Sequence, residues 1–283
     1  MSKIRRGWEL TKKSWGVLRA HPDLFRFPVY SAIATVPLAV LTLGPGLYFI
    51  EEDELAAAIP LIAVGILILT FISVYFSVGL AAAADKIFRG EQATVSDGLA
   101  VARANVGPIA GWAAFSAIVG TALSALESQG TLGQIVGRIL DIGWSLVTFL
   151  AVPVIAIEGT GPLETLKRSA TLFKSRWGQQ ITGNIAIGGI VAIALILPAA
   201  LMIGIGVAIW TSSGPAGAVL IMIGAIIFLI GMIIQKAMGG IFGVALYHYA
   251  AEGEAMGGFT AAELDSAVKL KNGATGGPTP SPA

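Results

Sequence analysis

The stretch EGTGPLETLKRSATLFKSRWGQQITGN, residues 158–184, is a charged segment between two long apolar runs. Its apolar residues recur at spacings of three and four, which predicts one face of a helix: Leu163, Leu166, Ala170, Phe173 and Trp177. Pro162 suits the first helical position and Glu164 the first turn. The basic residues lie away from that face: Lys167, Arg168, Lys174 and Arg176. Such a helix is expected to lie in the headgroup layer with Trp177 at the interface. The alternative is a helix that packs on its own loops.

The composition around this segment is that of a polytopic membrane protein. Of 283 residues, 55% are hydrophobic and 12% are charged, whereas soluble domains carry about 25% charged residues. Cysteine is absent, which excludes disulfides, thiolate metal sites and cysteine nucleophiles. Many of the 36 glycines fall inside apolar runs, where small residues let helices approach closely. Three pairs have the spacing for such contacts: Gly107/Gly111, Gly133/Gly137 and Gly239/Gly243.

Apolar runs long enough to cross a bilayer, about 20 residues, occur six times. The predicted spans are residues 28–50, 57–84, 106–126, 135–157, 183–210 and 217–250. Residues 1–27 precede them, have no signal-peptide pattern and predict an amphipathic helix at the membrane surface. The apolar stripe of that helix contains Ile4, Trp8, Trp15 and Leu18, and Thr11 interrupts it.

The distribution of basic residues predicts the orientation. Sixteen of the 18 Lys and Arg residues lie in residues 1–26, in the second and fourth loops, or in the tail. The opposite loops, 51–56, 127–134 and 211–216, contain no Lys or Arg. The positive-inside rule therefore places both termini in the cytoplasm.

The loops after the even-numbered spans share a pattern that predicts helix starts. Each has a capping residue three positions before an acidic one: Thr94/Asp97, Gly161/Glu164 and Thr260/Glu263. Each follows a glycine: Gly90, Gly159 and Gly253. A leucine follows each acidic residue: Leu99, Leu166 and Leu264. The pattern suggests three repeated hairpins, each closed by a cytoplasmic helix. The alternative is that any six-span protein needs three such helix starts.

The predicted fold is an all-α membrane bundle of six transmembrane helices, with both termini cytoplasmic and three or four interfacial amphipathic helices. The spans form one domain over residues 28–250, because no linker is long enough to divide them. Residues 251–271 are expected to form a C-terminal cytoplasmic helix. Residues 272–283, rich in Pro, Gly and Ser, are expected to be a disordered tail.

No catalytic, metal-binding or cofactor-binding motif is found in the sequence. The chemistry-bearing candidates are polar residues in or beside the spans, where burial is costly: Arg138, Asp141, Glu158 and Lys236. Arg138 and Asp141 are spaced to pair on one helix face. Glu158 and Lys236 are predicted at a similar depth, so they could pair with each other. These residues form either a solute or proton path or, in the favoured interpretation, contacts between helices.

Three stretches resemble a family of prokaryotic six-span membrane proteins described only as a domain of unknown function. They are RRGWELTKKSWGVLRAHPDLFRFP, AVPVIAIEGTGPLETLKRSATLFKSRWGQQITGN and ALYHYAAEG. The chain is also distantly similar to the membrane portion fused to some glycerophosphodiester phosphodiesterases. The resemblance implies six spans and a bacterial or archaeal cytoplasmic membrane. It implies no activity, cofactor or catalytic residue.

Two functions are consistent with these patterns. The first is a non-enzymatic scaffold or complex subunit, acting through the four basic residues of segment 158–184 together with Trp177, Trp8 and Trp15. Its expected partners are anionic lipid headgroups, a protein or a second copy of the chain, and not nucleic acid. The alternative is a transporter or channel for a hydrophobic or lipid-like solute, because glycine-rich aliphatic spans can enclose an apolar cavity. An enzyme is not expected, since no pair of reactive groups has a useful spacing.

Overall fold

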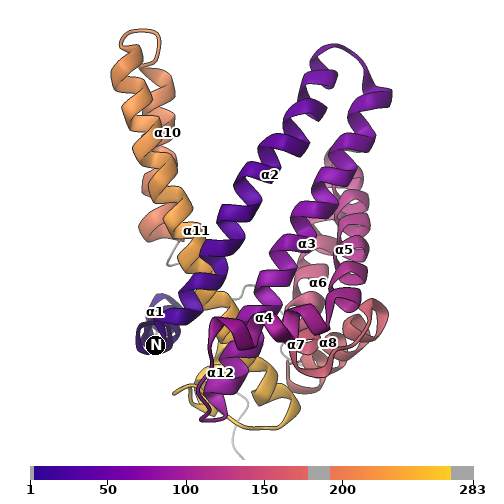
Figure 1. Cartoon of the computed structure of the whole chain (residues 1–283), viewed down its shortest axis with the longest axis vertical. Helices are drawn as coiled ribbons and strands as arrows, with labels where there is room; N and C mark the ends of the chain where they lie inside the picture. Colours follow the sequence, from indigo (N-terminus) through magenta and orange to yellow (C-terminus); the bar gives the residue numbers. More distant parts are fainter. Residues whose placement is uncertain (1–2, 178–191, 269–283) are drawn as a thin grey trace, which may run out of the picture.

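The computed structural model describes residues 3–177 and 192–268, and throughout these ranges the chain is helical without strands. Three helical hairpins rise from a layer of shorter helices (Figure 1). The first hairpin is α2 (Arg26–Glu51) and α3 (Leu55–Phe88), and the second is α5 (Val106–Glu127) and α6 (Gly130–Thr148). The third is α10 (Leu197–Ala208), preceded by the π-helical turn η2 (Ala192–Ile196), and α11 (Gly214–Ala251). The all-helical prediction is confirmed for these ranges.

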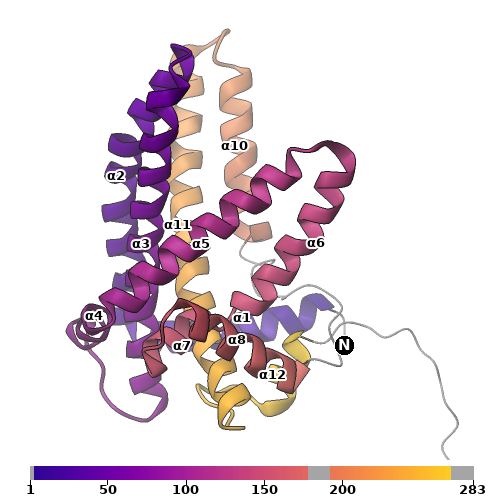
Figure 2. The same ribbon diagram turned by 90° about the vertical axis from the view of Figure 1, so that its right-hand side faces the viewer.

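The shorter helices gather at one end of the molecule, beneath the hairpins, and are called the base here (Figure 2). The base consists of α1 (Lys3–Ala20), η1 (Pro22–Phe25), α4 (Val95–Ala104), α7 (Ala151–Glu158), α8 (Pro162–Trp177) and α12 (Ala261–Val268). The predicted N-terminal segment therefore divides into α1 and η1. The predicted C-terminal helix is shorter than residues 251–271, because a turn over residues 252–260 precedes α12.

Four helices of the described chain are long and apolar enough to cross a membrane: Pro22–Glu51, Leu55–Phe88, Val106–Glu127 and Gly214–Ala251. The 34 residues of α3 and 38 of α11 span about 51 and 57 Å. A hydrocarbon layer is about 30 Å thick, so the lower ends of both helices extend into the base. Of the predicted span 183–210, residues 183–191 lie outside the described residues, and the described apolar part is Ala194–Ala208.

The predicted continuous span over residues 135–157 is wrong. Helix α6 ends at Thr148 and α7 begins at Ala151, so the chain breaks at Phe149 and Leu150. The physical reason is Pro153, which has no N–H to donate to the carbonyl of Phe149 and is best tolerated in the first turn of a helix, where it lies in α7. Helix α7 then packs against both α3 and α11 in the base.

Small residues set the separation within the third hairpin. Gly217, Gly224 and Gly231 recur every seven residues along α11; a Cβ at Gly217 or Gly224 would crowd α10, and one at Gly231 would crowd η2. A seven-residue repeat keeps one seam of a helix against its neighbour. Of the predicted glycine pairs, Gly133/Gly137 does lie tightly against the end of α5. A Cβ at Gly239 or Gly243 would meet no described atom within 4 Å, so this pair was predicted wrongly.

The three hairpins end in the same way at the base. Gly90, Gly159 and Gly253 all have left-handed backbone, with φ of +81°, +65° and +79°, the conformation that favours glycine after a helix. Reciprocal capping hydrogen bonds then start two of the following helices, between Thr94 and Asp97 and between Thr260 and Glu263. The leucines after the acidic residues are buried or packed on the core: Leu99, Leu166 and Leu264. This agreement supports three related hairpins.

Helix α1 buries a face that includes Thr11 and Leu18 of the predicted stripe but excludes Trp15. Leu10, Thr11, Ser14 and Leu18 are buried, whereas Trp15 is 46% exposed. The buried face contacts α11 and α12, and α1 is tied to α12 by an ion pair of 2.6 Å between Lys13 and Glu263. The side chains of α1 that pack against the neighbouring helices are thus smaller than tryptophan. The side chain of Trp8 lies outside the described part of the structure.

Candidate ligand pocket and the polar network below it

A pocket of about 570 Å³ lies between α2, α3 and α11. It falls within the range of small-molecule sites, about 300–1,000 Å³. The two helices that form most of its wall approach each other near the base and diverge above it (Figure 1). Most of the lining is apolar and includes Val36, Leu229, Met232, Ile233 and Phe242, together with Phe149 from the break between α6 and α7.

The polar lining of this pocket centres on Lys236. Its Nζ donates hydrogen bonds to the Oγ atoms of Ser31 on α2, at 3.1 Å, and Ser73 on α3, at 2.9 Å. Among the described residues no carboxylate contacts Lys236. Beside it, the Oε1 atom of Gln235 is buried and has no hydrogen-bond partner in the described structure. The pocket therefore combines aliphatic walls with one ammonium group and an unpaired amide oxygen.

The contact between Ser73 and Lys236 is the first of three described polar contacts that connect α3 to α11 or join the residues directly after them. The others join Asp85 to His248, at 2.6 Å, and Arg89 to Glu252, at 3.6 Å. The partners of every pair lie 163 residues apart in the sequence. Both helices run toward the base, so equivalent residues of the first and third hairpins face each other in register (Figure 2).

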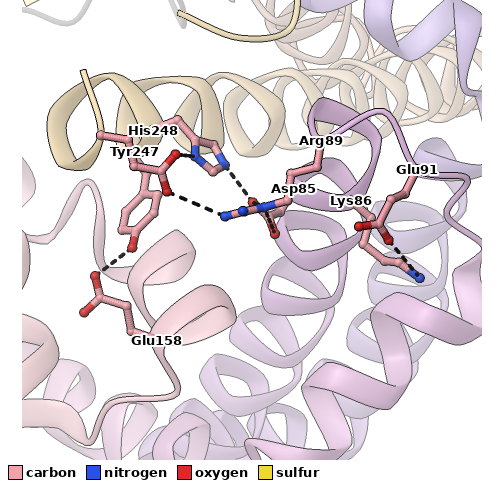
Figure 3. A network of polar contacts seen from close by, with 8 residues as sticks. Asp85, Lys86, Arg89, Glu91, Glu158, Tyr247 and His248 are labelled. Carbon is pink, nitrogen blue, oxygen red and sulfur yellow. Dashed lines mark hydrogen bonds and ion pairs between the residues drawn. The ribbon is translucent and has the colours of Figure 1, made fainter. Parts of the chain in front are cut away.

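His248 lies at the centre of the lower contacts, with no exposed surface (Figure 3). Its Nε2 faces Asp85, and its Nδ1 faces Glu252 at 2.8 Å. Arg89 contacts the same two carboxyl groups. Because ionised carboxylates only accept hydrogen bonds, two such partners match an imidazolium that donates from both nitrogens. With His248 as the imidazolium, the network holds two cations and two anions where α3 meets α11.

A second branch connects α11 to α7 and α8 through Glu158. The hydroxyl of Tyr247 donates to Glu158 at 2.7 Å, and Arg168 pairs with the same carboxylate at 2.8 Å. The predicted contact between Glu158 and Lys236 is therefore not formed. Tyr247, the partner of Glu158, lies about three turns of α11 closer to the base than Lys236, so the predicted similar depth of Glu158 and Lys236 is also wrong. Arg168 in turn contributes to the internal structure of the base.

Helix α8 has the predicted amphipathic pattern, but its apolar face is turned into the protein. Leu172, Phe173 and Trp177 are buried, and Trp177 has no exposed surface. Its ring packs against Phe173 and Tyr249, so the prediction that Trp177 contacts headgroups is wrong. Lys167, Lys174 and Arg176 are exposed, and Arg176 lies 4.9 Å above the ring of Tyr249. The exposed face of α8 is therefore basic rather than apolar.

Arg138 and Asp141 lie on α6, away from both the pocket and the network. Both are exposed, and no ion pair joins them in the described structure. The same part of the chain brings together no group of three His, Asp or Glu residues able to hold a metal ion.

Sequence reasoning missed Ser31, Ser73, Asp85, His248 and Glu252. A lone serine or histidine has no distinctive pattern, but a comparison between hairpins would have found the last three. The stretches DKIFRGE, from residue 85, and HYAAEGE, from residue 248, align on a common glycine and glutamate. In that alignment Asp85 faces His248, and Arg89 faces Glu252.

Comparison with known proteins identifies one match. The model of a family of unknown function, DUF6159, matches residues 61–258, which is more than half of the chain. Neither a curated protein nor a solved structure matches the chain. The matched region includes α11 and most of α3, and therefore both sides of the network. The whole of α2, which supplies one wall of the pocket, lies outside the matched region.

Proposed function

The chain belongs to the family of unknown function DUF6159, and from this premise we propose that it is a membrane protein that binds a lipid-like molecule between its first and third hairpins. The observation that carries the proposal is the pocket itself, with aliphatic walls and a volume of about 570 Å³. Bound apolar chains would replace lipid contacts of Val36, Leu229 and Met232. The ligand would be a solute that the protein retains or moves within the bilayer.

The proposed topology has six spans with both termini in the cytoplasm of a prokaryote, in its plasma membrane. Its support is that the basic loops of the sequence are the segments that form the base. The chain contains no cysteine, so single cysteines can be introduced without background. We expect Lys174→Cys to react with a membrane-impermeant maleimide only after permeabilisation, and Glu52→Cys and Ser212→Cys in intact cells. Labelling of Lys174→Cys in intact cells would reverse the orientation.

The base gives the pocket a fixed floor. Three helices meet there through the contacts of His248 with Asp85 and of Tyr247 with Glu158. Above the pocket the two hairpins diverge (Figure 1). A relative movement of the hairpins about this floor would widen or close the pocket without breaking the network.

The test of binding is to fill the pocket. Ala32 lines it, and Ala32→Trp would occupy the volume that an aliphatic chain needs. Val40→Trp is the matched control, because Val40 lies on the same helix, is 68% exposed and is not part of the lining. After gentle extraction, native mass spectrometry is expected to find lipid-like molecules on the wild type and the control but not on Ala32→Trp. Equal retention by both variants would refute the proposal.

A second candidate is a non-enzymatic scaffold that binds a protein partner through the base. The specific observation in its favour is the exposed basic surface of α8, with Lys167 and Lys174. Reversing both charges, in Lys167→Glu with Lys174→Glu, should release a co-isolated acidic partner. Arg138→Glu, which changes an exposed charge on α6, should not. An unchanged set of co-isolated proteins would exclude this role for α8.

The chain is proposed to be non-enzymatic in both cases. The distant likeness to the membrane portion of glycerophosphodiester phosphodiesterases stays a prediction and brings no activity to this proposal.

A further inference from the structure

Resting on the proposed function, we infer that the ligand is an anionic amphiphile whose carboxylate or phosphate group binds Lys236 while its aliphatic chain lies between α2 and α11. The inference concerns the charge of the ligand, which the apolar walls alone do not specify. It depends on the surroundings of Lys236, Ser31, Ser73 and Gln235.

The first argument is the missing counter-ion. An ammonium group removed from water is costly unless an anion compensates it, and the only described partners of Lys236 are two neutral hydroxyls. Residues 1–2, 178–191 and 269–283 contain no Asp or Glu, so every acidic side chain of the protein lies in the described ranges. None of them contacts Lys236. An anion supplied by the ligand is the compensation that the chain itself lacks.

The second argument is the arrangement of hydrogen-bond donors. Lys236 donates two of its three N–H groups to the oxygens of the two serines. The third N–H is therefore available to a ligand. Each serine hydroxyl still carries a proton to donate, and neither hydroxyl donates to another described residue. Ser31 is 97% buried, since 3% of its surface is exposed. One ammonium and two hydroxyl groups, from three helices, therefore lie within hydrogen-bond distance of one another in the wall of the same pocket.

The third argument is the unpaired oxygen of Gln235. A buried acceptor without a donor costs free energy, and Gln235 lines the same pocket as Lys236. A headgroup that carries a hydroxyl beside its anionic oxygens would satisfy this acceptor once rotation of the Gln235 side chain turned the oxygen toward the pocket. A phosphate-linked headgroup with a free hydroxyl has this chemistry, whereas a fatty acid supplies the anion alone.

The fourth argument is the depth of the polar groups. Lys236 lies 12 residues above His248 on α11, about 18 Å along the helix. Two apolar lining residues lie farther from the base than these polar groups. Leu229 is about two turns beyond Lys236 on α11, and Val36 is more than one turn beyond Ser31 on α2. The anionic group would thus lie toward the base and the aliphatic chain would extend away from it. This is the orientation of a lipid in the leaflet on the side of the base.

The experiment measures binding of charged and neutral probes to the purified chain in discs of phosphatidylcholine. The probes are a fluorescent fatty acid, its matched fatty alcohol, and fluorescent phosphatidylglycerol. The wild type should bind at least one anionic probe about tenfold more tightly than the alcohol. Lys236→Gln should bind all three probes with the affinity of the alcohol, and Lys236→Arg should keep the preference for the anion. Preference for phosphatidylglycerol over the fatty acid would identify a phosphate headgroup as the source.

Two outcomes separate this inference from the proposed function. If the wild type binds the fatty alcohol as tightly as both anions, and Ala32→Trp blocks all three probes, a lipid site exists but the anionic assignment is wrong. If Ala32→Trp blocks none of them, both proposals fail. A melting temperature of ligand-free Lys236→Gln well below the wild-type value would show that Lys236 is a structural residue and overturn its role toward a ligand. An equal or higher melting temperature is expected.

Discussion

Gly98 lies where α4 crosses α3, and a Cβ at this position would clash with the carbonyl oxygen of Gly79 and with the ring of Phe27. The two backbones are in contact there, so the crossing requires the absence of a side chain. Gly107, at the start of α5, has the opposite surroundings, since a Cβ would meet no described atom within 4 Å.

These two glycines provide a matched test of packing. Gly98→Ala is expected to lower the free energy of unfolding by about 1–3 kcal/mol, as overpacking does. Gly107→Ala is expected to be neutral or to stabilise by up to about 1 kcal/mol, because alanine has the higher helix propensity. Denaturation in mild detergent, followed by tryptophan fluorescence, compares the two variants. Equal stabilities would show that α3 and α4 can separate without cost.

Single residues were also the hardest part to predict from the sequence. The four intramembrane candidates were chosen by residue type, and only Lys236 lines the pocket. The other lining residues are ordinary serines and aliphatic residues that become a site only when α2, α3 and α11 come together. The importance of His248 likewise depends on two carboxylates that the fold brings to it. Glu252 lies one turn later in the chain, and Asp85 lies on α3.

At the scale of elements, helix α12 depends on one carboxylate. Partial burial raises the pKa of Glu263, but hydrogen bonds from Lys13 and Thr260 outweigh this effect and hold the pKa below the ordinary value of 4.5. A carboxylate whose pKa is lowered by folding stabilises the fold above its unfolded pKa, and the stabilisation is lost as the pH falls through the folded pKa.

We therefore expect α12 to lose protection as the pH falls below about 4.5, the ordinary pKa of glutamate. Hydrogen exchange of residues 261–268, corrected for the intrinsic effect of pH, would measure this loss. Glu263→Gln should reduce the protection of α12 at neutral pH, and that protection should depend less on pH than in the wild type. A wild-type profile that is flat from pH 6 to pH 3 would contradict the role of the ionised carboxylate.

Elements with local signals were predicted well. The capping boxes of α4 and α12 and the amphipathic pattern of α8 are encoded within a few residues. The break before α7 was missed because the span over residues 135–157 was predicted from the length of the apolar run alone. The buried face of α1 was predicted only in part, because its partners, α11 and α12, are distant from it in the chain.

At the scale of the whole molecule, the first and third hairpins are connected through the network at the base. Asp85 contacts the buried ring of His248 and also pairs with Arg89. Removing its carboxylate leaves the buried Nε2 of His248 without a partner, whereas Arg89 is partly exposed and still contacts Glu252. An unsatisfied buried group costs about 1–3 kcal/mol.

Asp85→Ala is therefore expected to lower the free energy of unfolding by about 1–3 kcal/mol. Glu91→Ala is the control, because its 4.0 Å contact with Lys86 is exposed and exposed pairs contribute little. Unfolding of both variants in the same detergent would be compared with the wild type. If the two variants were equally stable, the network would not hold the hairpins together.

The in-register packing of α3 against α11 also has a consequence for symmetry. If two identical helices packed in this way, each residue would face its own copy, so acid would meet acid and lysine would meet lysine. Because both helices belong to one chain, matched positions can hold different residues: Ser73 with Lys236, Asp85 with His248, and Arg89 with Glu252. A symmetric pair of separate hairpins could not form a single off-axis cationic site. Because α3 and α11 are joined in one chain, two helices that pack like a symmetric pair can carry opposite charges at matched positions.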